Sequence, residues 1–211
     1  MLKKSIYIVT IIVVLGWLWF GYRALPEVTK VTMVTSKAPV VTQPKPQLAA
    51  PLSRALERIT KKKFGTYVTP SNSPVSPERF SGYHTGVDFE TFPEEAKIDV
   101  PVLAVCGGVV RLRQWVGGYG GVVVADCVLD NQPVTVTYGH LRINSVANSF
   151  GENLIAGDTI GDLGTGYTAE TDGERKHLHL GIHKGDAINL LGYVDSVDLL
   201  GEYLDPQTLL Q

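Results

Sequence analysis

The five histidines of the chain lie in three short stretches of sequence. The first stretch reads GYHTGVDF over residues 82–89, the second YGHL over 138–141, and the third KHLHLGIH over 176–183. Imidazoles, together with a carboxylate such as that of Asp88, are typical zinc ligands in hydrolytic enzymes. The clustering therefore indicates a mononuclear zinc site with further histidines that can act as bases.

The spacing within these stretches suits β-strands. Successive side chains in a strand point to opposite faces, so His177 and His179 would share one face while the leucines between them face the core. The same rule places His84 and Asp88 on one face, and Gly86 between them leaves room for an ion to approach the backbone. Two imidazoles and one carboxylate leave the fourth position of a tetrahedral zinc ion open for water, which is typical of a catalytic site.

The order of the motifs H-x-G-x-D, Y-G-H-L and H-x-H resembles that of the lysostaphin-type (LytM-domain) zinc endopeptidases. Two further features agree with this resemblance. The sequence GYGG at 118–121 is similar to the family's glycine–tyrosine turn, and AGDTIG at 156–161 followed by GTG at 164–166 is similar to its glycine-rich approach to the H-x-H strand. The likeness covers roughly residues 80–185 and is specific, because several separated motifs fall in register.

The resemblance implies a role for each residue of the site. It implies that His84, Asp88 and His179 bind one zinc ion. It implies that His177 is the general base or acid that handles the proton of water, and that His140 is its partner, which polarises the water or stabilises the oxyanion. The chemistry is suitable, because an imidazole titrates near neutral pH and can carry a proton from water to the leaving amine.

Other residues near these motifs have structural explanations. His183 has no role in the family pattern and is expected at the surface, and a place at the border of the cleft is the alternative because it continues the alternation of His177 and His179. Tyr83 and Tyr138 are expected to pack in or beside strands, where aromatic residues are common. The loop from Thr165 to Lys176 carries several charges, and either a wall of the substrate groove or a solvated loop would explain it.

The N-terminus resembles a membrane anchor. Two lysines at positions 3 and 4 precede an uncharged, mostly apolar run from Ser5 to Tyr22. About 17 to 20 apolar residues suffice to cross a bilayer, and the lysines favour a cytoplasmic N-terminus. We therefore expect a transmembrane signal anchor over residues 1–23. The alternative is a cleaved signal peptide, which would normally have a shorter apolar run and a small-residue cleavage site. Either interpretation places the remaining chain outside the cytoplasm.

A proline-rich segment follows and is expected to form a semi-rigid stalk with a short helix, over residues 24–64. Helical spacing of Leu52, Leu56 and Ile59 favours the helix between Ser53 and Lys63. The basic run at 61–63 fits a solvated helix end, and contact with anionic lipid or a cell-wall polymer is the alternative.

Residues 65–211 are predicted to form one LytM-like domain with a mainly β, antiparallel, barrel-sandwich-hybrid fold. The two cysteines, Cys106 and Cys127, fall on expected strands that could be neighbours, so a disulfide and two free thiols both remain open. The tail from Gly185 to Gln211 is expected to form either a short packing helix or a loop, and its place against the domain is not assigned. The expected strands are 100–105, 108–115, 121–129, 133–140, 159–163 and 176–183, with a hairpin turn at Asp130–Asn131.

Length and charge leave few other function classes. A chain of 211 residues with a formal net charge of -2 suits one domain with appendages and gives no sign of nucleic-acid binding. The resemblance implies a membrane-anchored zinc metalloendopeptidase that hydrolyses peptidoglycan stem peptides or cross-bridges on the extracytoplasmic side.

Two alternatives to this enzyme belong to other classes. A non-catalytic cell-wall-binding or regulatory domain of the same fold would usually lack part of the ligand set, whereas all five positions are filled here. A biotinyl or lipoyl carrier domain needs a modifiable lysine in a hairpin, commonly beside a methionine. The only methionines are Met1 and Met33, outside the domain.

Overall fold

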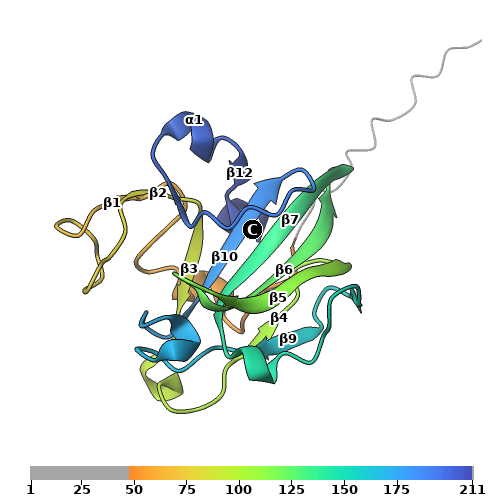
Figure 1. Ribbon diagram of the computed structural model, residues 1–211, viewed down its shortest axis with the longest axis horizontal. Helices are drawn as coiled ribbons and strands as arrows, with labels where there is room; N and C mark the ends of the chain where they lie inside the picture. The colour runs from red at the N-terminus through yellow and green to blue at the C-terminus, as the bar shows by residue number, and fades with distance from the viewer. Residues whose placement is uncertain (1–47, 211) are drawn as a thin grey trace, which may run out of the picture. The chain divides into compact units, whose positions relative to one another are not determined.

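A seven-stranded antiparallel sheet forms the centre of the computed structural model, which describes residues 48–210 (Figure 1). Its strands are rich in valine and threonine, whose branched side chains favour extended backbone. The order is β12–β10–β7–β6–β5–β8, and β3 pairs with β10 next to β12. The bounds are β3 Gly86–Glu90, β5 Gly108–Val116, β6 Gly120–Leu129, β7 Gln132–Leu141, β8 Asn153–Leu154, β10 His177–Lys184 and β12 Tyr203–Leu204.

Two smaller sheets complete the β structure and confirm its antiparallel character. One has the order β1–β2–β11, and the other is the pair β4–β9. Their bounds are β1 Tyr67–Val68, β2 Gly82–His84, β11 Tyr193–Val194, β4 Pro101–Leu103 and β9 Thr159–Asp162. Each strand expected from the sequence is present, with ends that differ by at most two residues.

The turn between β6 and β7 is the hairpin expected from the sequence. Asp130 and Asn131 have φ angles of 50° and 59°, so both adopt the left-handed conformation that a two-residue hairpin loop of this type requires. Asparagine and aspartate tolerate this conformation better than other non-glycine residues. The turn sets the register of the longest strand pair in the domain, from Gly121↔Leu141 to Leu129↔Gln132.

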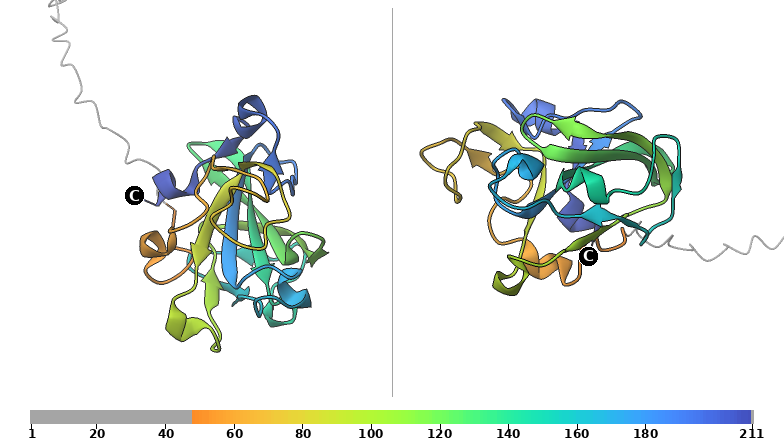
Figure 2. Two further views of the ribbon diagram at one scale, coloured as in Figure 1. Left: turned by 90° about the vertical axis from the view of Figure 1, so that its left-hand side faces the viewer. Right: turned by 60° about the horizontal axis from the view of Figure 1, so that its bottom comes forward.

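The core lies between the large sheet and the β4–β9 pair (Figures 1 and 2). Fully buried side chains from both layers meet there, including Val102 and Ile160 from the small pair and Val136, Tyr138 and Leu180 from the large sheet. The helices are short and lie at the periphery. They are η1 Ala55–Arg58, η2 Pro93–Glu95, η3 Ile143–Ser145, η4 Ala169–Thr171, α1 Val197–Leu200 and α2 Pro206–Leu209.

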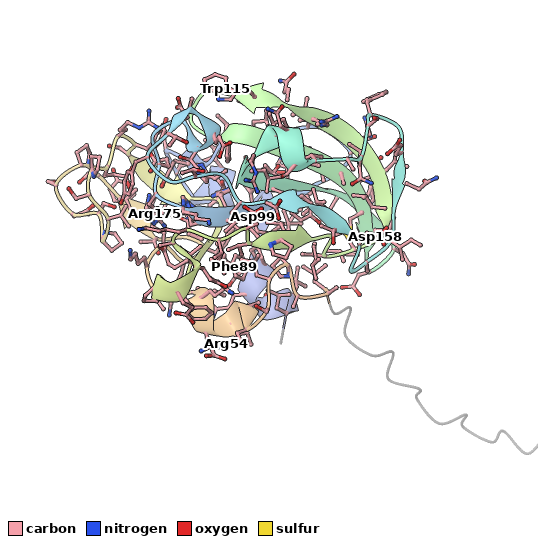
Figure 3. The ribbon with its side chains drawn as sticks, turned by 90° about the horizontal axis from the view of Figure 1, so that it is seen from below. Arg54, Phe89, Asp99, Trp115, Asp158 and Arg175 are labelled. Carbon is pink, nitrogen blue, oxygen red and sulfur yellow. A yellow bond between two sulfur atoms is a disulfide. The ribbon has the colours of Figure 1, made fainter. Side chains whose placement is uncertain are left out.

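The segment 48–64, expected to belong to the stalk, packs against the domain instead. Leu48, Leu52 and Ile59 are buried in the common core, and the short helix between them is a single 3₁₀ turn. Figure 3 shows Arg54 on this segment and Phe89 of β3 above it. The expected anchor over 1–23 and the proline-rich part up to residue 47 lie outside the described residues. No helix within residues 48–210 is long and apolar enough to cross a bilayer.

Cys106 and Cys127 form a disulfide. Cys106 lies two residues before β5, and Cys127 lies in the neighbouring strand β6, so the bond links the segment that enters β5 to the adjacent strand of the large sheet. Of the two possibilities that the sequence left open, the disulfide is therefore the one present. Disulfides of this kind persist in oxidising compartments outside the cytoplasm.

Candidate metal centre and active-site cavity

Three side chains converge on one point at the side of β10. Nε2 of His84 lies 3.0 Å from Nδ1 of His179, and Oδ1 of Asp88 lies 3.2 Å from each of these nitrogens. All three residues are buried, and they are the one group in residues 48–210 whose ligand atoms are arranged to hold a metal ion. A tetrahedral zinc ion with bonds of about 2.0 Å separates its ligand atoms by about 3.3 Å, so both the donor set and its spacing fit zinc.

Strand pairing explains why these residues meet. His179 is paired with Asp88 across the β3–β10 ladder, which places both side chains at the same height on the sheet. His84 ends β2, and the chain then leaves that strand at Thr85 before β3 begins. The hydroxyl of Thr85 donates a hydrogen bond to the carbonyl oxygen of Leu191 at 2.6 Å, and its amide donates to that of Gly192 at 3.0 Å. This break lets two consecutive strands in different sheets direct their ligands to one site.

Hydrogen bonds outside the ligand triangle select which nitrogen faces the metal. Nδ1 of His84 lies 3.2 Å from the carbonyl oxygen of Lys63, which can only accept, so Nδ1 carries the hydrogen and Nε2 is left with its lone pair. Nε2 of His179 lies 3.5 Å from the hydroxyl of Tyr119, which leaves Nδ1 for the metal. Such contacts are the usual means of orienting metal-binding histidines.

Arg175 holds the second oxygen of Asp88. Its Nη2 donates to Oδ2 of Asp88 at 2.8 Å, and its Nε donates to Glu90 at 2.9 Å. Burial opposes ionisation of Asp88, but its interactions with His177, His84 and Arg175 outweigh this effect and hold its pKa well below the ordinary value. Asp88 is therefore a carboxylate, as metal binding requires.

Two further histidines stand next to each other beside the metal centre. The rings of His140 and His177 are 4.3 Å apart between centroids. Nδ1 of His177 donates to the carbonyl oxygen of Arg175 at 2.8 Å, while its Nε2 lies 3.3 Å from Oδ2 of Asp88. His177 thus contacts the metal ligand Asp88, and His140 lies against His177.

His140 has two unusual properties for a non-glycine strand residue. Its φ of 63° is left-handed, a strained conformation that often marks functional sites. Its Nδ1 is buried and has no hydrogen-bond partner among the described residues. Burial, followed by the nearby charges of His177 and His179, holds the pKa of His140 well below its ordinary value. A neutral imidazole with a free nitrogen is suited to bind water or a substrate group.

These residues open into a cavity of about 280 Å³. Its lining combines aromatic and aliphatic side chains with the reactive groups Asp88, His140, His177 and His179. The aromatic and aliphatic side chains are those of Phe80, Tyr119, Leu190, Leu191 and Tyr193. Lys62 and Glu174 add charged groups to the lining. A mostly apolar cavity with a few polar groups in its lining is typical of a ligand-binding site.

The sequence model of a protein family, described as peptidase family M23, matches residues 82–190. The match covers more than half of the chain and includes all five histidines. The chain belongs to peptidase family M23. As an M23 protein it is a zinc metallopeptidase, and its His84–Asp88–His179 site is the intact metal site of that family.

One solved structure supports the same fold for this M23 chain. The crystal structure of cbpa from L. salivarius REN matches with a TM-score of 0.50 and 22% identity, covering 79% of this chain and 95% of that one. LytU matches with a TM-score of 0.44 and 22% identity over 70% of this chain and 82% of that one. A zinc containing peptidase from Vibrio cholerae matches with a TM-score of 0.44 and 19% identity, covering 74% of this chain and 38% of that one. No curated protein matches the chain.

The structure brings together every residue predicted for the site of this M23 enzyme. His183 lies apart from it, with its ring 5.0 Å from that of Tyr203. Gly86 does not leave open space for an ion, as was expected, because a Cβ there would lie 2.8 Å from the ring of His179 and 2.4 Å from the carbonyl oxygen of Leu180. Glycine at this position makes room for a ligand side chain, and the space is not left free for the ion.

Sequence reasoning missed several residues that line or support the site. Arg175 was placed in a charged loop without a partner, and Lys62 was placed in a solvated helix end. Tyr119 was noted only as part of a turn. Tyr193 lies in the tail, where a short helix or a loop was expected and the strand β11 is found. Their partners are distant in sequence, so no local pattern could have revealed them.

Proposed function

We propose that this M23 enzyme is a membrane-anchored, extracytoplasmic endopeptidase that hydrolyses peptide bonds in peptidoglycan stem peptides or cross-bridges. The observation that carries the proposal is the convergence of the three ligand atoms within 3.2 Å of one another, beside a cavity lined by Asp88, His179 and two further histidines. Peptidoglycan peptides are the substrates that the family implies.

In this proposal His84, Asp88 and His179 hold the zinc ion. A bound zinc ion supplies Lewis-acid chemistry, because it polarises a peptide carbonyl and lowers the pKa of water to about 7. With three protein ligands, a tetrahedral zinc ion would have its fourth position free for water. Arg175 keeps the Asp88 carboxylate ionised and oriented, and Lys63 and Tyr119 orient the two imidazoles.

We assign proton transfer to His177 and His140. Because Nδ1 of His177 is committed to the carbonyl of Arg175, Nε2 is the nitrogen that takes a proton from water and returns it to the leaving amine. The unpartnered Nδ1 of His140 lies in the same cavity and is placed to hold the water or the developing oxyanion. The two rings are tilted by 37° with their centroids 4.3 Å apart, which places both groups close enough to act on the same water and peptide bond.

Location outside the cytoplasm rests on two independent features. The apolar run from Ser5 to Tyr22 is long enough to anchor the chain, and the Cys106–Cys127 disulfide suits an oxidising compartment. The non-catalytic alternative is disfavoured, because a binding domain has no need for a complete ligand set with a neighbouring pair of proton carriers.

The test uses the full chain in detergent with His177→Ala, His179→Ala and, as a matched control on the same strand, His183→Ala. Bound zinc is measured by elemental analysis, and release of muropeptides from purified peptidoglycan is measured by chromatography. We expect His179→Ala to lose zinc and activity together, and His177→Ala to keep most of its zinc but lose turnover. His183→Ala should behave as the wild type. Full activity of either of the first two variants would refute the assignments.

A further inference from the structure

The segments that flank the family match meet at the metal centre. The stretch 61–66 precedes the matched residues and runs beside β2 and β3, while Tyr193 follows them in β11. The amide of His84 donates to the carbonyl of Thr66 at 3.0 Å, and the amide of Asp88 donates to the carbonyl of Lys62 at 3.0 Å. Tyr193 is paired with His84 on the other side of β2. Both flanks therefore contact the strands that carry metal ligands.

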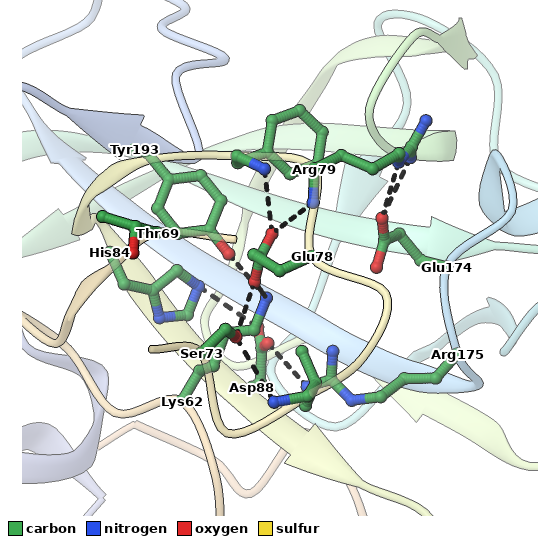
Figure 4. A network of polar contacts seen from close by, with 12 residues as sticks. Lys62, Thr69, Ser73, Glu78, Arg79, His84, Asp88, Glu174, Arg175 and Tyr193 are labelled. Atoms are coloured by element: carbon green, nitrogen blue, oxygen red, sulfur yellow. Dashed lines mark hydrogen bonds and ion pairs between the residues drawn. The ribbon is translucent and has the colours of Figure 1, made fainter. Parts of the chain in front are cut away.

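Lys62 is buried between these flanks, although its sequence context suggested a solvated position. Only 2% of the residue is exposed. Its Nζ donates to the hydroxyl of Tyr193 at 2.7 Å and forms an ion pair with Oε2 of Glu78, also at 2.7 Å (Figure 4). A buried ammonium group needs such partners, because an unpaired charge in the protein interior is strongly destabilising.

Glu78 is itself fixed in place. Its Oε1 accepts hydrogen bonds from the backbone amides of Arg79 and Phe80, each at 3.0 Å, and its Oε2 accepts from the hydroxyl of Ser73 at 2.8 Å. The carboxylate of Glu78 is therefore held in a fixed position, and through the ion pair it fixes the position of the Lys62 ammonium group. Figure 4 shows this network directly beside His84 and Asp88.

The contact with Lys62 determines how the hydroxyl of Tyr193 can act. An ammonium group only donates, so the oxygen of Tyr193 must accept, and the hydroxyl hydrogen is left to point elsewhere. Within residues 48–210 no group accepts that hydrogen. The ring of Tyr193 lies 5.3 Å from that of His84 and 5.5 Å from that of Phe80, which holds it in the cavity wall.

We infer that Tyr193 donates its hydroxyl hydrogen to a backbone carbonyl oxygen of the bound peptide, and that Lys62 positions this hydroxyl. Tyr193 then contacts the substrate, whereas Lys62 acts through Tyr193. The inference rests on the proposed function only for the statement that the ligand is a peptide. A carbonyl oxygen is the group that recurs along every peptide and that a single fixed donor can recognise.

Activity of the zinc-loaded full chain tests the role of the pair. We expect Tyr193→Phe and Lys62→Met each to lower kcat/KM on peptidoglycan about tenfold, the effect of one hydrogen bond to substrate, with zinc content unchanged. Because both act through one hydroxyl, the double variant should be no worse than Tyr193→Phe, and Lys62→Arg should recover part of the loss. Lys61→Met is the matched control, since that side chain is 43% exposed and pairs with Glu90, and it should have no effect.

A second measurement does not depend on turnover. In protein labelled with ¹³C at the tyrosine ζ carbon, the Tyr193 resonance at fixed pH should move in Lys62→Met but stay in Lys61→Met. In zinc-loaded His177→Ala, adding a pentaglycine peptide or a D-alanyl cross-bridge peptide should move this resonance again. If the wild type cleaves no peptidoglycan, the proposed function fails while these resonances still decide the inference. Full activity of Tyr193→Phe, losses that multiply in the double variant, or an unmoved resonance would overturn it.

Discussion

Nε2 of His84 lies 3.0 Å from Nδ1 of His179, although 95 residues separate them in the chain. The contact results from two features of the fold. The β3–β10 ladder aligns His179 with Asp88. The break between β2 and β3 at Thr85 places His84, the last residue of β2, beside both of them. Two buried imidazoles at this distance, both next to a carboxylate oxygen, form an arrangement that a metal ion stabilises. The following predictions test this centre and its supports.

Space beside β10 at Gly86 is needed for the ring of His179. In Gly86→Ala the new Cβ would lie 2.4 Å from the carbonyl oxygen of Leu180 and 2.8 Å from that ring, so the ring must move out of the ligand triangle. We expect a loss of about 1–3 kcal/mol in the free energy of unfolding and much weaker zinc binding. Urea titration and a chelator competition measure the two effects. Gly117→Ala, where nothing lies within 4 Å of the added Cβ, should change neither.

Arg175 should control metal affinity without touching the metal. Arg175→Met removes the partner of Asp88 Oδ2 and of Glu90, leaving two buried carboxylates with fewer donors. We expect zinc affinity to fall about 10- to 100-fold, the usual effect of losing an outer partner of a metal ligand. Competition with a fluorescent chelator measures this change. Arg111→Met breaks a half-exposed pair with Asp126 far from the site, and a similar loss of affinity there would contradict the argument.

Acid should destabilise the metal-free domain below the ordinary pKa of histidine. Burial lowers the pKa of His179 to about 4 and holds that of His140 well below its usual range. The folded state then binds fewer protons than the unfolded state, so stability present above pH about 6.5 is lost as the pH falls toward the folded pKa values. Urea unfolding at pH 7, 6 and 5 in a chelator should show this decline. The slope should be shallower in His140→Asn, and an equal slope would show that His140 does not contribute.

The disulfide should matter for stability and not for the metal centre. Cys106 and Cys127 are separated by 21 residues, and closing a loop of this size stabilises a domain by about 3 kcal/mol in the chain-entropy account. The double variant Cys106→Ser/Cys127→Ser should lose about that amount by urea titration. Zinc content measured in the same preparation should stay at the wild-type level. Loss of zinc from a folded variant would mean that the bond also supports the site.

The histidine motifs were predictable because strand periodicity acts locally. In the stretch 176–183, alternation alone separates His177 and His179 from the leucines that face the core, and the structure confirms this. The long strands were also visible, since runs of valine bounded by turn residues specify them. The two-residue strands β11 and β12 were not, because their pairing depends on distant partners and not on any pattern of their own.

The supporting charges were hidden for the same reason. Arg175 reads as one of several charges in a polar loop, yet its partners Asp88 and Glu90 lie 87 and 85 residues earlier. Lys62 reads as part of a solvated basic run, yet Tyr193 is 131 residues away. Only the fold shows that these side chains are buried and paired, and thus that they belong to the site.

The most direct test is a crystal structure of the zinc-loaded domain with diffraction data collected on both sides of the zinc absorption edge. We predict a single anomalous peak at bonding distance from Nε2 of His84, Oδ1 of Asp88 and Nδ1 of His179, with Asp88 Oδ2 still bound to Arg175. A peak at other residues, or no peak in crystals whose protein contains zinc by elemental analysis, would contradict the metal centre described here.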